Sequence, residues 1–409
     1  MKASWLWLGI IPLLFLPNFT QSNTGFGELE TSDFLIVPLF IIILLLPRKS
    51  VHNTYSKFIV IPGLAFLMWS LIGVVAIYLQ YDFVNEDRKV LFSLLKVAKF
   101  ALYTIAPLSM SKRLVNDSVR EDYMWILAFC GVILGLGVFF EKTVFSGSDR
   151  LAMIASFKAL NLVSVAMAII LTYLLAYLLC GGGSPEWRRF CTFSLIVLGL
   201  GFTFTDGRGG WVAAVVGIIY MSYKRGLLRK RTLVFGGFTA AAAIVFYFTN
   251  TEFRRSVDMT IFPETRYDNQ ENILPIDDGY RMQELLGAIK GFTGNIILGS
   301  GFYHRGREVG LMRTSSHNFW AQMLFETGIV GFFLIATMWI RMWRHANTPA
   351  AQQYKYSLPL KTAMITAFVA GLSGDYYYGG LALLAIMLCY APTGSLTPLQ
   401  AAPITAAAK

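Results

Sequence analysis

The sequence predicts an all-α integral membrane protein of about twelve transmembrane helices, with one large, partly helical loop between the ninth and tenth. Three observations lead to this prediction. The 409 residues are 55% hydrophobic and only 14% charged, whereas a soluble globular domain carries roughly 25% charged residues. The apolar residues gather in long runs, and the basic residues gather in the short connections between them. A net charge of +11 arranged in this way indicates orientation in a membrane and not a nucleic-acid groove.

The apolar runs give the number of helices, since a membrane-spanning helix needs roughly 20 mostly apolar residues. The candidate spans lie near residues 4–17, 34–47, 58–80, 90–110, 123–140, 153–180, 190–205, 210–223, 232–249, 318–340, 362–374 and 379–392. The first run also resembles a signal peptide, but no small-x-small cleavage site follows it, so we expect a helix there. We therefore divide the chain into helices one to nine (1–249), a loop domain (250–317), helices ten to twelve (318–392) and a tail (393–409).

The basic residues fix the expected orientation. With the N-terminus inside, the cytoplasmic segments contain nineteen Lys and Arg residues, whereas the short external loops contain five. Short loops rich in Lys and Arg stay on the cytoplasmic side of a membrane. We therefore expect both termini in the cytoplasm and the loop at 250–317 on the external side.

The long loop is polar and balanced in charge, with eight basic and nine acidic residues. Asp277 or Asp278 is a suitable N-cap for a helix inside it. The apolar residues that would share one face of this helix are Met282, Leu285, Leu286 and Ile289. We expect a second, short helix around Phe262–Tyr267. Long ordered loops on a rigid scaffold commonly carry function.

Several cations gather on the expected external side at membrane depth, where each ionisable residue is a candidate for function. These are Lys96, Lys99, Arg150, Lys158 and Arg208, and the loop adds Arg281. Such a set suits a pyrophosphate, because an arginine fork binds two phosphate oxygens at once. The alternative for Lys96 and Lys99 is that they extend outward and only anchor helix ends. Arg208 lies in a glycine-rich turn whose exposed backbone amides resemble an anion nest.

His317 is the candidate proton acceptor, because it lies where the external loop meets the tenth span. A histidine there titrates near neutral pH and can reach a hydroxyl at the lipid surface. Ser315 or Ser316 would cap the following helix. Further polar residues, spaced four apart on one face of that helix, are Asn318, Gln322 and Glu326. The alternative is an interfacial histidine that only donates and accepts hydrogen bonds.

Metal and disulfide chemistry have weaker support. Glu28, Glu30 and Asp33 form an acidic group in the first external loop, but such groups are usually only solvated. The four cysteines lie in or beside apolar runs, which argues against a disulfide framework or a thiolate metal site. We expect no cofactor and no metal.

Stretches in the second half of the chain resemble motifs of the O-antigen ligase and polymerase superfamily of bacterial membrane glycosyltransferases. T-D-G-R-G-G-W (205–211) resembles the family's arginine-glycine element at the start of a span. Y-R-M-Q-E-L-L-G-A-I-K (280–290) with G-S-G-F (299–302) resembles its arginine helix and Gly-x-Gly turn. H-N-F-W-A-Q-M-L-F-E-T-G-I-V-G (317–331) resembles its histidine helix. The similarity covers about residues 150–335.

This resemblance implies a metal-independent, inverting glycosyltransferase of the bacterial inner membrane, with its active site in the periplasm. The donor would be a glycan linked to undecaprenyl pyrophosphate, and the preferred acceptor would be lipid A–core in lipopolysaccharide assembly. Arg208 and Arg281 would engage the pyrophosphate, and His317 would receive or orient the acceptor's proton. Other substrate-binding candidates are Lys96, Lys99, Arg150, Lys158, Asn318 and Gln322.

Three alternatives remain open from the sequence. A polymerase would use the same donor but extend another lipid-linked repeat, and a third type of enzyme would transfer to protein. A transporter or flippase would use the intramembrane charges, including Asp206, as a path. Transporters often contain repeated halves with broken helices at the midplane, whereas no repeat is visible here and the charges lie near the outer face.

Overall fold

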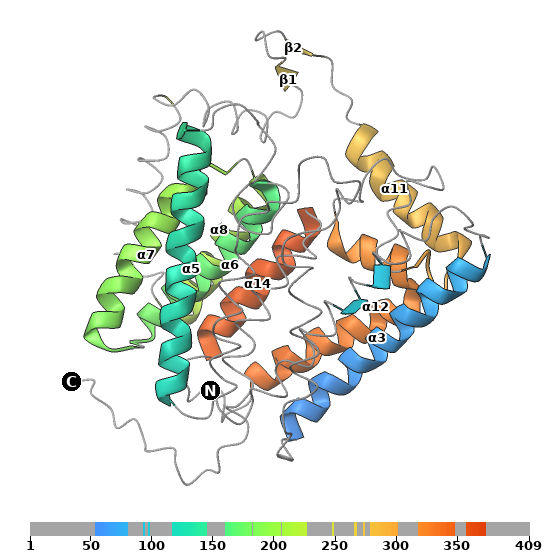
Figure 1. Cartoon of the computed structure of the whole chain (residues 1–409), viewed down its shortest axis with the longest axis horizontal. Helices are drawn as coiled ribbons and strands as arrows, with labels where there is room; N and C mark the ends of the chain where they lie inside the picture. Colours follow the sequence, from blue (N-terminus) through green and yellow to red (C-terminus); the bar gives the residue numbers. More distant parts are fainter. Residues whose placement is uncertain are drawn as a thin grey trace.

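The computed structural model describes residues 54–80, 93–94, 97–98, 117–144, 160–181, 183–205, 207–226, 248, 266–267, 273–274, 279–301, 318–347 and 357–373. This part of the chain is helical apart from one short two-stranded ribbon (Figure 1). Its eight helices are α3 (Thr54–Gln80), α5 (Asp117–Val144), α6 (Leu160–Leu179), α7 (Pro185–Thr203), α8 (Arg208–Lys224), α11 (Gly279–Gly294), α12 (Phe319–Ala346) and α14 (Ser357–Ser373). The ribbon consists of β1 (Arg266–Tyr267) and β2 (Ile273–Leu274), paired antiparallel.

Seven of the helices coincide with predicted spans: α3, α5, α6, α7, α8, α12 and α14. The helix expected after Asp277 or Asp278 is α11. The predicted spans near 4–17, 34–47, 90–110, 232–249 and 379–392 lie outside the described residues, apart from short helical pieces at 93–94, 97–98 and 248. The structure therefore confirms the helical class for the part it describes.

One predicted element is wrong. The short helix expected around Phe262–Tyr267 is not formed at its C-terminal end, where Arg266 and Tyr267 pair as a strand with Leu274 and Ile273. The proline at position 263 favours an extended neighbourhood. Sequence periodicity does not reveal this pairing, because each strand has only two residues.

The ends of α6 and α7 show how local chemistry sets the helix boundaries. Ser184 caps α7, because its Oγ accepts a hydrogen bond from the Trp187 N–H at 3.2 Å, and Pro185 occupies the first helical position. Arginines bind carbonyls at the end of α6 and just after it. Arg188 donates to the Gly181 carbonyl at 2.7 Å, and Arg225 donates to the Leu179 carbonyl.

The helices form two packed groups that meet at α12. α5 packs on α7, and α6 contacts both of these as well as α8 and α14 (Figure 1). On the other side, α12 packs on α3, α11 and α14. One continuous apolar core, which includes Tyr173, Trp187, Phe319 and Met364, runs through both groups. Hence α12 is the helix through which the two groups are held together.

Small and hydroxylated residues let these helices approach closely. Added Cβ atoms at Gly135 in α5 or Gly201 in α7 would overlap the facing helix, so the two backbones touch there. Ser194 of α7 donates to the Ala128 carbonyl of α5 at 2.6 Å. Such contacts are typical of helix packing in membranes, where lipid is as apolar as leucine and close packing supplies the attraction.

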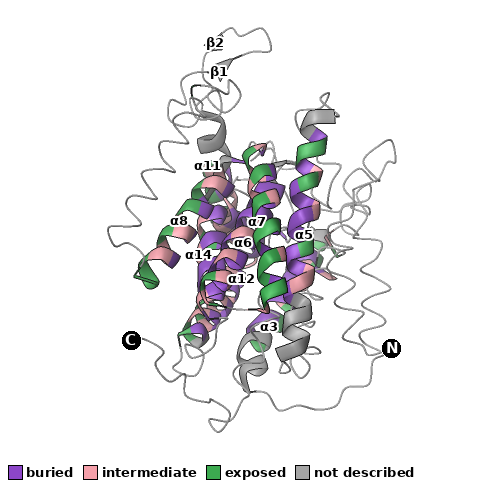
Figure 2. Cartoon of the chain, turned by 90° about the vertical axis from the view of Figure 1, so that its left-hand side faces the viewer, coloured by how far each residue is buried: buried purple, intermediate pink, exposed green. Residues whose placement is uncertain are grey.

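The outer faces of the bundle are apolar. Figure 2 shows exposed residues along the outward sides of α5, α7 and α8; the exposed apolar side chains there include Phe129, Phe193, Ile196, Val215 and Ile219. Monomeric soluble proteins rarely expose apolar patches of this extent. Among the described residues, Met124–Glu141 and Phe319–Arg344 are long and apolar enough to cross a membrane, and Ile61–Ala76, Val163–Leu179 and Ser357–Leu372 are shorter apolar helices.

Candidate active site

The start of α12 is fixed by Asn318. Its Oδ1 accepts a hydrogen bond from the Ala321 N–H at 3.0 Å, the bond that defines an N-cap. Its Nδ2 donates to the Leu372 carbonyl of α14 at 3.2 Å. The helix therefore begins after Asn318, and the prediction that Ser315 or Ser316 supplies the cap is wrong. His317 is the residue before the cap.

A buried polar pair follows one turn into α12. Gln322 and Glu326 are each 1% exposed, and the Gln322 Nε2 donates to the Glu326 Oε1 at 2.6 Å. The spacing of four residues predicted that these side chains share one helix face, and the hydrogen bond confirms it. A carboxylate at membrane depth requires partners, because lipid offers no hydrogen bonds. Gln322 supplies one of them.

α12 is broken two residues after Glu326, at Gly328. This residue has φ 63° and ψ −171° inside an otherwise helical stretch. That region of backbone space is open essentially to glycine alone. A break of this kind removes intrahelical hydrogen bonds and leaves backbone groups that must be satisfied elsewhere.

The turn after α11 supplies most of the missing bonds. Ser300 N–H donates to the Phe325 carbonyl at 2.8 Å, and Gly301 N–H donates to the Glu326 carbonyl at 2.9 Å. In the opposite direction, Ile329 N–H donates to the Ile296 carbonyl at 2.8 Å. These three bonds bind the turn at 296–301 to the broken segment of α12. We call this arrangement the α11–α12 joint.

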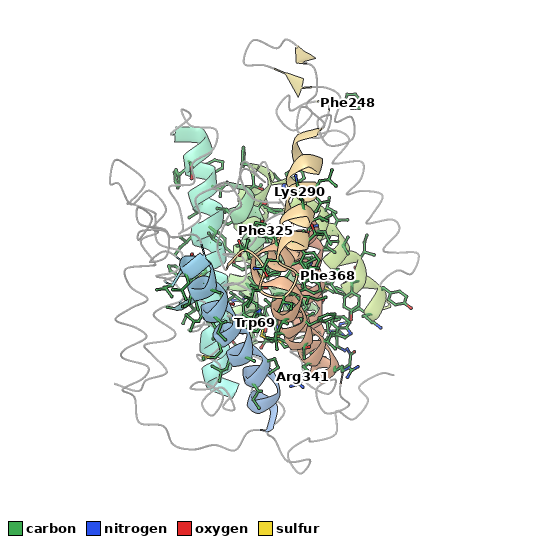
Figure 3. All side chains as sticks on the ribbon, turned by 90° about the vertical axis from the view of Figure 1, so that its right-hand side faces the viewer. Trp69, Phe248, Lys290, Phe325, Arg341 and Phe368 are labelled. Carbon is green, nitrogen blue, oxygen red and sulfur yellow. The ribbon has the colours of Figure 1, made fainter. Side chains whose placement is uncertain are left out.

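A fourth bond to the joint comes from α3. The Trp69 indole Nε1 donates to the Thr327 carbonyl at 2.9 Å, while the Thr327 hydroxyl bonds the Met323 carbonyl at 2.7 Å. Figure 3 shows Trp69 on α3 beside α12. Three consecutive carbonyls at the break, from Phe325 to Thr327, are thus hydrogen-bonded to groups outside α12.

The joint depends on glycines at the crossing point. Gly299 has φ 70°, and an added Cβ there would lie 2.5 Å from the Gly328 nitrogen. An added Cβ at Gly328 would overlap the Ile297 carbonyl oxygen and lie 2.8 Å from the Gly299 nitrogen. The two backbones therefore touch where any side chain would separate them.

α11 packs on α12 through small residues. Ala288 is buried against Phe325 and Ala321, whereas Leu286 and Ile289, two of the four residues predicted to form an apolar face, are exposed. Ala288 lies beside the first half of α12, and Ile296 at the break. The two helices therefore run side by side in the same direction, and the start of α11 lies toward the start of α12.

α8 begins at the end of the bundle where α11 and α12 also begin. Gly217 of α8 meets Thr366 of α14, and Lys224, later in α8, is close enough to Lys361, earlier in α14, for their charges to repel. The two helices are therefore antiparallel. The start of α8, at Arg208, lies toward the end of α14, which is the end that Asn318 binds.

The structure describes the backbones of two of the predicted site residues. Arg208 is the first residue of α8, and Arg281 lies in the first turn of α11. The starts of α8, α11 and α12 thus share one end of the bundle. The Gly207 carbonyl there accepts a hydrogen bond from the Ser164 hydroxyl of α6 at 3.3 Å, which holds the first turn of α8 against α6.

The remaining predicted residues lie outside the described part of the chain. They are His317, Lys96, Lys99, Arg150 and Lys158, together with the acidic group at Glu28, Glu30 and Asp33. The side chains of Arg208 and Arg281 are also outside it. Among the residues that the structure does describe, no group of three or more His, Cys, Asp or Glu side chains could hold a metal ion.

The sequence reasoning missed two parts of this region. Trp69 gave no signal, because its partner Thr327 lies 258 positions away along the chain. The sequence identified the glycines of G-S-G-F and E-T-G only as parts of family motifs. In the structure Gly299, Gly301 and Gly328 share a positive φ, a backbone conformation that favours glycine. Two Gly-rich elements separated by a loop were the available signal for a backbone crossing.

One comparison with known proteins gives a match in this region. Residues 193–336 match the family model described as O-antigen ligase. The matched segment runs from α7 into α12 and contains Arg208, Arg281 and His317 together with both sides of the α11–α12 joint. A comparison with curated proteins found no match.

Proposed function

We propose that this protein transfers a glycan from undecaprenyl pyrophosphate to an acceptor hydroxyl. The match of residues 193–336 to the O-antigen ligase family model, which confirms the resemblance seen in the sequence motifs, supports this proposal. The family match supports a membrane glycosyltransferase of the ligase and polymerase type in the bacterial inner membrane. The donor, the acceptor, the inverting and metal-independent course and the orientation are our proposals.

The observation that supports this function best is the shared end of α8, α11 and α12. Arg208 and Arg281 start two of these helices, and His317 precedes the third. The start of a helix carries partial positive charge and unpaired N–H groups, so it favours a phosphate. Two arginines at such positions fit a pyrophosphate, which is the leaving group of the proposed donor.

The chemistry is a single displacement. The acceptor hydroxyl oxygen attacks the anomeric carbon, the bond from that carbon to the pyrophosphate oxygen breaks, and the configuration inverts. His317 takes the hydroxyl proton, and undecaprenyl pyrophosphate leaves with both electrons of the broken bond. Arg208 and Arg281 stabilise the charge that develops on the leaving group. General-base help of this kind is typically worth about 10²–10⁴-fold in rate.

The other predicted binding residues divide into two kinds. Lys96, Lys99, Arg150 and Lys158 are proposed to add positive charge around the pyrophosphate. Asn318 and Gln322 already hold bonds within the protein, to Leu372 and Glu326. In our proposal these two act on the substrate by fixing the first turns of α12, and hence the position of His317.

We propose twelve spans with both termini in the cytoplasm, the loop at 250–317 in the periplasm and lipid A–core as the acceptor. A polymerase is the second candidate, because it shares the donor and the family. The transporter alternative has less support, since a translocation path has no need of the proposed proton-accepting histidine or of the proposed phosphate-binding arginines.

The test is reconstitution in detergent with purified components. Wild-type protein, undecaprenyl-pyrophosphate-linked glycan and lipid A–core should give a glycosylated lipid A–core that migrates more slowly on a gel, and the rate should not change in EDTA. His317→Ala should lower the rate about 10²–10⁴-fold with unchanged membrane insertion. A longer lipid-linked chain formed without lipid A–core would identify a polymerase. Absence of any covalent product, or full activity of His317→Ala, would contradict the assignment.

A further inference from the structure

We propose that the end of α8 and α14 opposite the candidate active site binds the phosphate of an anionic phospholipid, with Lys361 and Lys224 as its cationic partners. This site is separate from the glycan-transfer chemistry and depends only on the protein lying in a membrane. In the orientation expected from the sequence it faces the cytoplasmic leaflet.

Lys361 is the residue that requires an explanation. It lies in the second turn of α14 and is only 8% exposed. Among the described residues it has no hydrogen-bond acceptor and no carboxylate partner, and the one charged group that acts on it is Lys224, which repels it. Holding two cations close together without a counterion is costly, because like charges repel each other. A bound anion removes this cost.

The residues around Lys361 increase the need for an anion. It sits near the start of α14, where the helix dipole is positive. The hydroxyl of Ser357, in the first turn of the same helix, is directed to another partner, because it donates to the Ala346 carbonyl at 2.9 Å. The carboxylate side chains that the structure describes, Glu141, Glu186 and Glu326, belong to α5, α7 and α12, so α8 and α14 supply no neutralising group within the described chain.

Lys224 is placed to share the same anion. It is exposed at the last turn of α8, with its Nζ 5.6 Å from the ring centroid of Tyr223 and 5.9 Å from that of Tyr220. The guanidinium of the neighbouring Arg225 already has a partner inside the protein, because it donates to the Leu179 carbonyl. The two lysines, one with a mostly buried side chain and one exposed, therefore form the pair that an incoming phosphate would bridge.

The surface beside the pair indicates that the phosphate carries lipid chains. Above Lys224, one exposed stripe of α8 follows helical spacing and is apolar along its length. Its members are Val212, Val215, Ile219 and Tyr223. Tyr220 contacts Trp343 of α12 at 6.2 Å between ring centroids, and tyrosine and tryptophan favour the headgroup level of a membrane. An anionic head at the lysines and acyl chains along this stripe match one ligand class, an anionic phospholipid.

The experiment measures stabilisation of delipidated, detergent-solubilised protein by added lipid. Phosphatidylglycerol should raise the thermal midpoint of the wild type, whereas phosphatidylcholine and millimolar inorganic phosphate should not. Lys361→Met should bind phosphatidylglycerol about ten- to hundredfold more weakly, since it loses a charge-assisted contact. Arg344→Met, which removes an exposed cation from the end of α12, is the matched control and should respond as the wild type does.

The same data separate a lipid site from a buried charge that only destabilises the fold. Without lipid, Lys361→Met should melt no lower than the wild type, because the variant removes a cation that Lys224 repels. Lys361→Arg should keep the response to phosphatidylglycerol, and Lys224→Met should weaken it. Equal responses of the wild type and Lys361→Met would refute the site. Equal stabilisation by inorganic phosphate, or by phosphatidylcholine, would refute the assignment to an anionic lipid.

Discussion

Replacing Gly328 with alanine tests whether the α11–α12 joint positions the active site. An alanine Cβ would lie 2.5 Å from the Ile297 carbonyl carbon and 2.8 Å from the Gly299 nitrogen, whereas ordinary contacts begin at 3.4 Å. The obstacles are backbone atoms, so no side-chain rotation relieves the overlap. The turn at 296–301 must move away from α12.

The cost follows from two effects. Holding a non-glycine residue in this region of φ and ψ costs about 1–3 kcal/mol. Separating the backbones also breaks bonds such as that from Ile329 N–H to the Ile296 carbonyl, each worth about 0.5–1.5 kcal/mol net. With all three inter-segment bonds lost, the joint is destabilised by about 2.5–7.5 kcal/mol. Since whole domains are stable by only about 5–15 kcal/mol, we expect the joint to open.

An open joint frees α11 to shift relative to the start of α12, which separates Arg281 from His317. Misplacement of a catalytic group by about 1 Å can cost on the order of 10²-fold in rate. We therefore expect Gly328→Ala to lower the glycan-transfer rate at least that far and to lower the thermal midpoint in detergent. Both are measured on purified protein with equal membrane expression.

Gly294→Ala is the matched control. Gly294 ends α11 close to the joint, but an added Cβ there meets nothing within 4 Å. This variant should retain transfer and thermal stability, so that a general effect of substituting glycine near the loop is excluded. A Gly328→Ala protein with wild-type transfer rate and midpoint would refute the positioning role of the joint.

Three further predictions concern other contacts. Gly217→Ala places a Cβ against the Thr366 hydroxyl, so it should lower the thermal midpoint by overpacking worth about 1–3 kcal/mol. Adding Thr366→Ala should restore part of the loss, and a double variant no better than the single one would contradict this explanation. Trp69→Phe removes the donor to the break in α12 and should destabilise the protein by about 0.5–1.5 kcal/mol, measured as a lower midpoint; an unchanged midpoint would show that water or lipid replaces the bond. Cys180 is partly exposed just after the end of α6. In a Cys389→Ser variant, a membrane-impermeant maleimide should label Cys180 in inside-out vesicles only. Labelling in right-side-out vesicles would contradict the proposed orientation.

The helices could be predicted because apolar length is a local property. The runs at 58–80 and 210–223 correspond to α3 and α8 within a few residues. The boundaries were less accurate where polar residues continue a helix past the apolar run, since α5 begins at Asp117 and not near residue 123. Hydropathy measures the bilayer core, whereas a helix continues for as long as its backbone bonds and caps allow.

The polar side of α12 was predictable in part for the same reason. The spacing of Gln322 and Glu326 is a property of one helix, and their hydrogen bond follows from it. The cap was harder, because the serines at 315 and 316 and the asparagine at 318 are all good N-caps. The bond from Asn318 to the Leu372 carbonyl of α14 is a tertiary contact, and it selects among these candidates in a way that local sequence does not.

The break in α12 shows why the site itself was only partly predictable. Its partners are backbone groups of Ser300 and Gly301 and the indole of Trp69, and backbone donors are the same in every residue. Only the absence of a side chain at Gly299 and Gly328 is visible in the sequence, and a glycine alone does not identify its neighbour. Irregular backbone at membrane depth is tolerated where protein groups satisfy it. A break with three bonded carbonyls is therefore a stable element, and it gives the start of α11 and the start of α12 a fixed relation that an unbroken helix would not provide.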